Sequence, residues 1–271
     1  MYRKDKIFFY FLPIVLIFLI NFIISSCDLF GSSSSSSRGG GGSGGSGGSD
    51  ETGEDFSDVV LSSAWTAYND CVDNDGNHEN ATYFNLQNPD GILKKISDGS
   101  DSGITVEMEA ENVSSWDPTG TPQAGTDAYN TFNGFLNIDE VASYGNENNP
   151  WYYQVTFSNL DPAKKYAFVT TANRNFDYVA DGRQPRWTKF TISGADTFSN
   201  ISSSGVSRVS AGVVKINTGY NTVNGYVAAW TGITASDGTF TVRSENVGAE
   251  GPGESFMSYG LQGFKLMELS E

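Results

Sequence analysis

The chain is poor in histidine, cysteine and basic residues, and each shortage argues against a class of function. It has 16 Lys and Arg against 32 Asp and Glu, and a formal net charge of -16. Such a surface repels phosphate backbones, so no nucleic-acid partner is expected, and no basic surface is present to hold anionic lipid. His78 is the single histidine, so any Ser-His-Asp or Cys-His scheme would have to use it. No Gly-x-Ser-x-Gly elbow precedes a predicted helix, and no Walker or dinucleotide-binding glycine pattern follows a predicted strand.

Two cysteines give no disulfide framework, because Cys27 is assigned to lipid attachment below. We expect Cys71 to be a small buried residue at the edge of a strand. No window predicts an amphipathic helix of useful length, and no internal repeat is found. What the chain does contain is 31 glycines and 13% aromatic residues, a profile typical of extracellular β-structure with many turns.

Residues 1–26 have the pattern of a secretory signal peptide. The first six residues, MYRKDK, are net positive, and an almost entirely apolar run follows from Ile7 to Ile24. A membrane-spanning helix needs about 20 apolar residues, so an uncleaved anchor is the alternative interpretation.

The segment Ile24-Ser25-Ser26-Cys27 resembles the lipobox of bacterial lipoproteins. The resemblance implies cleavage before Cys27 and acylation of its thiol and its new amine. Several acyl chains make attachment to a membrane effectively permanent. We therefore expect an exported protein, lipid-anchored to the bacterial cell envelope and facing the cell surface or the periplasm.

Residues 27–55 contain a long Ser- and Gly-rich stretch that has almost no apolar surface to bury. We predict that it is a flexible tether, and that residues 56–271 form a single folded domain.

The folded part is predicted to be all-β. Alternation of apolar and polar residues recurs, and dipeptides such as Asp90-Gly91 and Asp237-Gly238 indicate turns between strands. Many short strands with glycine-rich turns favour a β-sandwich, specifically a jelly roll. The predicted strands are Val59–Tyr68, Thr82–Leu86, Ile104–Ala110, Trp151–Phe157, Tyr166–Ala172, Trp187–Ile192, Val213–Asn217, Tyr226–Thr231, Phe240–Arg243 and Gln262–Met267.

Two short segments resemble those of known sandwich families. Leu160-Asp161-Pro162, followed by Tyr166, resembles the tyrosine corner of fibronectin type III domains, in which the hydroxyl bonds back to the chain before the next strand. The closing segment Ser258–Leu266 resembles the last strand of galactose-binding-like jelly rolls, which are common as carbohydrate-binding modules. That second resemblance implies sugar binding by loops at one end of the sandwich.

The segment Thr170–Trp187 joins two predicted strands and is the first candidate binding region. Sugars need planar polar groups for their hydroxyls and a flat aromatic face for their C–H side, and this segment has both. Alternatively, its aspartates pair with its arginines and Trp187 packs inward. The predicted ligand-binding residues here are Asn173, Arg174, Asn175, Asp177, Arg186 and Trp187.

A second irregular region places Trp116 beside a Pro- and Gly-containing loop, with Tyr129 further along. We include both in the predicted binding site, with a place at the edge of the core as the alternative for Trp116. By contrast, Trp65, Trp151 and Trp230 lie in predicted strands and are expected in the core.

A calcium site is the metal hypothesis for Asp73, Asp75 and Asn77, whose oxygens are closely spaced on a glycine turn. The segment departs from the EF-hand pattern, because no Glu lies at the required distance. An exposed Asx-rich turn without metal is the alternative.

These features favour a tethered, non-catalytic glycan-binding module. A structural or adhesive lipoprotein that binds another protein is the second hypothesis. The third is a glycan-active enzyme on a jelly-roll scaffold, which needs two carboxylates facing each other across a groove. Glu107 and Glu109 share one strand face, but a solvated face explains them equally well.

Overall fold

The computed structural model describes residues 64–72, 77–114, 120–140, 149–176, 180–182, 185–247 and 257–270, and the backbone of residues 144–145. All of them belong to one compact unit, Asp50–Glu271. The predicted signal peptide, Cys27 and the tether lie outside the described residues. In the part of the chain that is described, no helix has the length and apolar content needed to cross a membrane.

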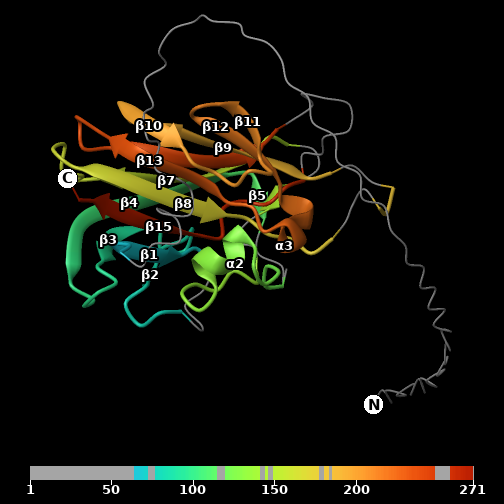
Figure 1. Cartoon of the computed structure of the whole chain (residues 1–271), viewed down its shortest axis with the longest axis horizontal. Coiled ribbons are helices and arrows are strands. Elements are labelled where there is room, and N and C mark those ends of the chain that lie inside the picture. Colours follow the sequence, from blue (N-terminus) through green and yellow to red (C-terminus); the bar gives the residue numbers. More distant parts are fainter. Residues whose placement is uncertain are drawn as a thin grey trace, which may run out of the picture. The chain divides into compact units, whose positions relative to one another are not determined.

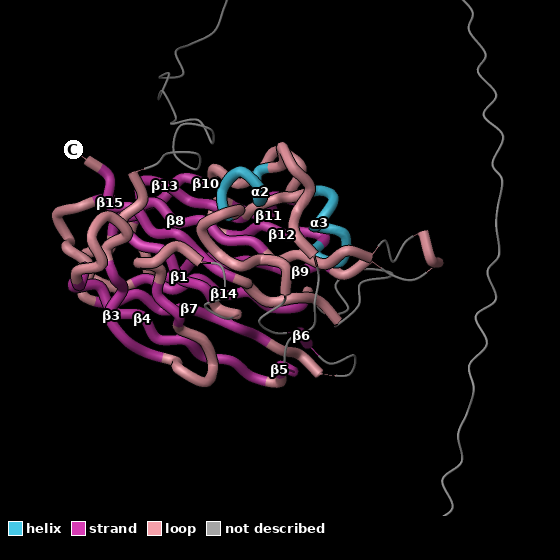
Figure 2. Tube along the Cα trace, turned by 90° about the horizontal axis from the view of Figure 1, so that it is seen from below, coloured by secondary structure: helices cyan, strands magenta, loops and turns pink. Residues whose placement is uncertain are grey.

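Two β-sheets contain most of the described strands (Figures 1 and 2). The first sheet has six strands in the order β10–β13–β8–β15–β1–β2. Its strands are antiparallel apart from the β1–β2 pair. The strands are β1 (Ala67–Asp70), β2 (Thr82–Tyr83), β8 (Lys165–Thr171), β10 (Thr197–Asn200), β13 (Ala228–Thr234) and β15 (Gly263–Leu269).

The second sheet has seven antiparallel strands in the order β11–β12–β9–β14–β7–β4–β3. A small pair, β5 (Val113–Ser114) and β6 (Tyr144–Gly145), is separate. This architecture confirms the predicted all-β sandwich. The seven strands are β3 (Asp90–Lys94), β4 (Asp101–Glu111), β7 (Tyr152–Ser158), β9 (Trp187–Ser193), β11 (Ser207–Ser210), β12 (Val213–Asn217) and β14 (Phe240–Asn246).

Aromatic side chains from both sheets form the main core. Phe157 and Phe240 of the seven-stranded sheet stack with ring centroids 4.8 Å apart. Phe157 also meets Phe168 and Phe264 of the six-stranded sheet at 5.7 and 5.1 Å. All four side chains are fully buried, so this cluster joins the two layers by removing large apolar areas from water.

A second apolar cluster covers the outer face of the six-stranded sheet. Ala167 and Val169 of β8 pack there with Phe132 of helix α2 (Asp127–Phe132) and with the following turn. This explains why β8 is apolar along its whole length, since both of its faces are covered. Two further short helices are η1 (Thr218–Tyr220) and α3 (Asn221–Asn224).

The helices α2 and α3 were not expected, and they are too short to show a helical period. Asp90-Gly91 was predicted as a turn, which is wrong, because both residues lie in β3. Strands β10 and β11 were also missed, because they have mostly exposed residues and no clear alternation. The prediction that Trp65, Trp151, Trp230 and Cys71 are buried is confirmed.

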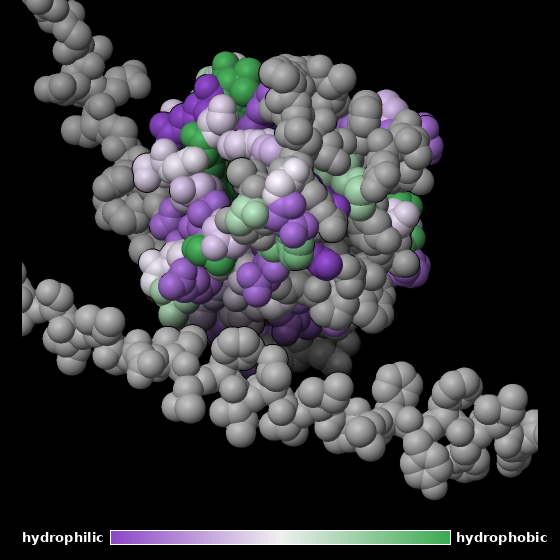
Figure 3. All heavy atoms as spheres, turned by 90° about the vertical axis from the view of Figure 1, so that its right-hand side faces the viewer, coloured by the Kyte–Doolittle hydropathy of each residue, from purple (hydrophilic) through white to green (hydrophobic). Residues whose placement is uncertain are grey.

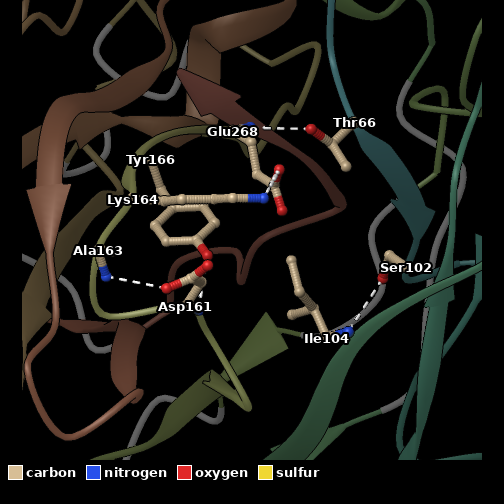
Figure 4. Close-up of polar contacts among 8 residues, drawn as sticks. All are labelled: Thr66, Ser102, Ile104, Asp161, Ala163, Lys164, Tyr166 and Glu268. Carbon is tan, nitrogen blue, oxygen red and sulfur yellow. Dashed lines mark hydrogen bonds and ion pairs between the residues drawn. The ribbon is translucent and has the colours of Figure 1, made fainter. Parts of the chain in front are cut away.

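The predicted tyrosine bond is present at the start of β8 (Figure 4). The Asp161 N–H donates to the Tyr166 hydroxyl at 2.8 Å, across the turn that precedes the strand. Close by, the Lys164 ammonium pairs with the Glu268 carboxylate at 2.7 Å. The first contact fixes the entry of the chain into β8, and the second links this turn to β15.

We predict that Tyr166→Phe lowers the free energy of unfolding by about 1–2 kcal/mol, because one partly buried hydrogen bond is lost while the ring stays in the core. Urea unfolding at neutral pH measures the change. Tyr129→Phe is the matched control, since its half-exposed hydroxyl has no hydrogen bond among the described residues. Equal effects of the two substitutions would contradict the role given to the Tyr166 hydroxyl.

Lys265 is an unusual member of the second cluster. Its side chain starts from the middle of β15, and only 3% of the residue is exposed. The Nζ atom lies 3.9 Å from the centroid of the Phe135 ring and 4.4 Å from that of Tyr68. No carboxylate among the described residues pairs with it. Burial therefore lowers the pKa of Lys265 from its ordinary value of 10.5 to about 7, although the aromatic rings partly stabilise the charged form.

We predict that this lysine makes the fold more stable as the pH rises from about 7 to about 10.5. In this window the unfolded chain still holds the proton and the folded chain has released it, so the free energy of unfolding increases with pH. Lys265→Met should stabilise the protein by about 2–4 kcal/mol at pH 6–7 and by little near pH 10.5.

Chemical denaturation of both proteins across this pH range measures the difference. Lys94→Met, on an exposed position of β3, is the control and should change stability equally at every pH. A gain for Lys265→Met that is also the same at every pH would show that burial does not perturb this amine.

Candidate functional site

The end of the sandwich where β8 leads into β9 contains four of the eight residues predicted to bind ligand. We call it the loop end, and it comprises residues 172–176, 185–186, 217–226 and 257–262. Figure 3 views the molecule from this side, and the coloured atoms there form small separate polar and apolar groups. The local structure of the loop end determines which of the predicted residues are accessible to a ligand.

Asn173 was predicted to contact ligand, but it is fully buried and has a structural role. The Asn221 side chain donates to the Asn173 Oδ1 at 3.0 Å and to the Ala172 carbonyl at 2.9 Å. Asn221 also accepts from the Tyr226 N–H at 2.8 Å. Asn173 is therefore part of a buried network that stabilises the loop, and its assignment to ligand binding stays a prediction.

Gly225 brings the two short helices of this region together. Its φ of +59° ends α3, and its carbonyl accepts from the Ala128 N–H of α2 at 2.7 Å. A Cβ at this position would lie 2.0 Å from the Thr126 Oγ1, so the close approach requires glycine. Thr126 is the N-cap of α2 and accepts from the Tyr129 N–H.

Arg174 and Arg186 converge on one aromatic ring at the loop end. Their guanidinium carbons lie 5.8 and 5.6 Å from the centroid of the Tyr259 ring. Arg186 also donates to the Tyr259 hydroxyl and, at 3.6 Å, to the Met257 sulfur. Tyr259 is buried and is held through its backbone by the Thr188 hydroxyl. Two of the predicted arginines are thus brought together, on a tyrosine that the sequence did not single out.

The other predicted ligand residues are spread over the molecule. Asn175 is exposed in the loop, and Trp187 is a half-buried residue that opens β9. Tyr129 lies in α2 and not in an irregular loop, so its assignment to the same site as Trp187 is not supported. Trp116 and Asp177 lie outside the described residues.

Only Asn77 of the three predicted metal ligands is described, since Asp73 and Asp75 lie outside the described residues. The Asn77 Oδ1 accepts from the Asn137 N–H at 2.6 Å, and the Oδ2 of buried Asp70 accepts from the same N–H at 2.8 Å. Within the described residues, no group of three or more His, Cys, Asp or Glu side chains gathers to hold a metal.

The outer face of the seven-stranded sheet carries a row of polar and aromatic side chains that ends near the loop end. Glu111, Tyr152, Glu245 and Lys189 are aligned partners on adjacent strands β4, β7, β14 and β9. Trp187 precedes Lys189 by two residues and therefore projects from the same face. Alternation also places Glu107 and Glu109 on this face, where Glu109 accepts from the Gln154 amide at 2.7 Å.

An ion-pair network orders the centre of this row. The Glu245 carboxylate lies 3.0 Å from the Lys189 ammonium and 3.2 Å from the Arg243 Nε. The Arg243 N–H does not point at the carboxylate, so this second contact is an ion pair and not a hydrogen bond. The Arg243 guanidinium lies over the Tyr152 ring, with its carbon 3.8 Å from the centroid. These contacts hold the tyrosine and the arginine in place on the sheet.

A pocket of about 270 Å³ opens where β4, β7 and β14 reach the loop end. It lies beside the ion-pair network and combines two aromatic residues, Trp151 and Tyr152, with several hydrogen-bonding groups. Sequence reasoning missed it, because its residues come from three strands that are distant in the chain. The available signal was the run of charged and aromatic residues at alternating positions of strands whose other face is apolar. The lining includes Glu111, Asn112, Tyr152, Arg243, Glu245 and Asn246.

Comparisons of the chain with protein-family models, with curated proteins and with solved structures find no match.

Proposed function

We propose that this protein is a non-catalytic glycan-binding module that a lipid on Cys27 tethers to the bacterial cell envelope. The observation that carries the proposal is the outer face of the seven-stranded sheet, where Tyr152 lines a pocket with hydrogen-bonding side chains and Trp187 projects from the same face. Aromatic rings pack against the C–H faces of sugar rings, and carboxylate, amide and guanidinium groups bond their hydroxyls.

The charge distribution is consistent with this function. The cations Lys189 and Arg243 are already paired with Glu245, and the whole chain is strongly acidic. A neutral ligand suits such a surface better than a polyanion does. A partially solvated sheet face also accommodates an extended chain, as a polysaccharide requires.

The tether extends the range of the module. A flexible segment of about 20 Gly and Ser residues has a root-mean-square reach of roughly 25 Å, which lets a folded head turn toward a large fixed polysaccharide. A galactose-binding-like jelly roll is the fold that we propose within the sandwich class. Its closing strand is β15, which the resemblance of Ser258–Leu266 indicates.

We predict that Trp187→Ala weakens binding of a glycan identified on an array of bacterial and plant polysaccharides by about tenfold, because one aromatic contact contributes about 1–1.5 kcal/mol. Arg174→Ala tests the loop end in the same assay. Titration calorimetry with the identified glycan measures both. Val209→Ser, at a residue that is 57% exposed on edge strand β11, is the control and should bind normally.

If binding persists unchanged in both the Trp187 and the Arg174 variants, the site assignment is wrong. If no glycan binds the intact protein, the function itself is wrong, and a protein partner becomes the better hypothesis.

We predict that Cys27→Ser releases the protein from the membrane fraction into the soluble fraction of its host, because no acyl chains anchor it. Intact-mass measurement of the unsubstituted protein should find residue 27 as a lipid-modified N-terminus. Ser26→Ala, which keeps a small residue before the cysteine, is the control and should leave the protein in the membrane fraction. An unmodified Cys27 in a chain that still carries residues 1–26 would favour the uncleaved anchor.

A further inference from the structure

Asn246 lies at the wall of the pocket of about 270 Å³ described above, here called the sheet-face pocket. The residue is 8% exposed, and its Oδ1 accepts from the Trp151 N–H at 3.3 Å. Among the described residues, its buried Nδ2 donor has no hydrogen-bond partner. A buried amide nitrogen without a partner destabilises the fold, so such atoms in native proteins are usually satisfied by water or by a ligand. Because Asn246 lines the pocket, that space can supply the missing acceptor.

The other groups on the pocket wall restrict what that acceptor is. Glu111 is exposed and lies on one side of the Tyr152 strand, and Glu245 lies on the other side. The carboxylate of Glu245 is paired with Lys189 and Arg243. An anionic ligand would therefore lie near the Glu111 carboxylate, while the Arg243 cation on the pocket wall is already paired with Glu245. Repulsion between the Glu111 carboxylate and a negatively charged group makes a carboxylated or sulfated ligand a poor fit.

We propose that the pocket binds one neutral sugar residue, with one hydroxyl that accepts from the Asn246 Nδ2 and a second that donates to the Glu111 carboxylate. A hydroxyl has one hydrogen and two lone pairs, so a neutral sugar can satisfy both an amide donor and a carboxylate acceptor. The part of the Tyr152 ring that Arg243 does not cover supplies the apolar contact. The pocket volume of about 270 Å³ suits one sugar ring, with the rest of the chain lying along the sheet.

This inference rests on the proposed glycan-binding function and names the ligand class and the residues that select it. It goes beyond the aromatic contact, because it assigns specificity to a buried amide and an exposed carboxylate that no sequence pattern indicated.

Asn246→Asp is the sharpest variant, because the new carboxylate can still accept from the Trp151 N–H while the donor to the ligand is lost. We expect a roughly tenfold loss of affinity for a neutral hexose oligosaccharide, measured by calorimetry. Glu111→Gln should weaken the same ligand and should also reduce discrimination against an oligouronate of equal length. The unsubstituted protein should bind the neutral oligosaccharide at least tenfold more tightly than the oligouronate.

Asn200→Asp is the control, because the Asn200 Oδ1 likewise accepts from a backbone N–H, but on β10 of the other sheet. Its thermal unfolding midpoint reports the cost of the chemical change, and its glycan affinity should be unchanged. Tight binding of the oligouronate, or normal affinity in Asn246→Asp, overturns this inference and leaves the glycan-binding function standing. Failure of every glycan to bind overturns both.

Discussion

Strand β8 presents large apolar side chains to two sides, and each side must be removed from water. Phe168 faces the aromatic cluster between the sheets, while Ala167 and Val169 face α2 and its following turn. The seven-stranded sheet satisfies the first requirement and the segment 120–140 satisfies the second. The long connections at the loop end follow from this arrangement, because the chain must cross from one layer to the other there. The candidate binding groups are located on these crossings and on the strands that they join.

The architecture could be predicted because apolar and polar residues alternate in strands such as Phe240–Asn246, where every second residue is buried. The elements that the sequence did not predict also have a physical explanation. Strand β11 has four exposed residues, so it carries no apolar face to detect. Helix α2 is a six-residue element that depends on the Thr126 cap and on tertiary packing of Phe132, neither of which produces a measurable period. Asp90-Gly91 has turn chemistry but pairs with β4, because sheet pairing overrides local preference.

The candidate site was predictable only where its residues are neighbours in sequence. Arg174 and Arg186 belong to one quoted segment, and the structure brings them to the same tyrosine. Asn173 has the same polar chemistry as Asn175, yet it is enclosed by Asn221 from a segment almost 50 residues away. Composition cannot separate a displayed amide from a buried one. The sheet-face pocket is a still clearer case, since its lining depends on the register of β4, β7 and β14.

The order of strands in the six-stranded sheet has a consequence for the assembly of the molecule. The last strand, β15, lies in the interior of that sheet, between β8 and the first strand, β1. A chain that emerges with its N-terminus first, from a ribosome or across a membrane, therefore holds β1 and β8 without their shared neighbour until β15 has emerged. Both strands would expose unpaired backbone during that interval. This sheet can thus be completed only after all the other described strands have emerged, and a chaperone that shields strand edges would act before that point.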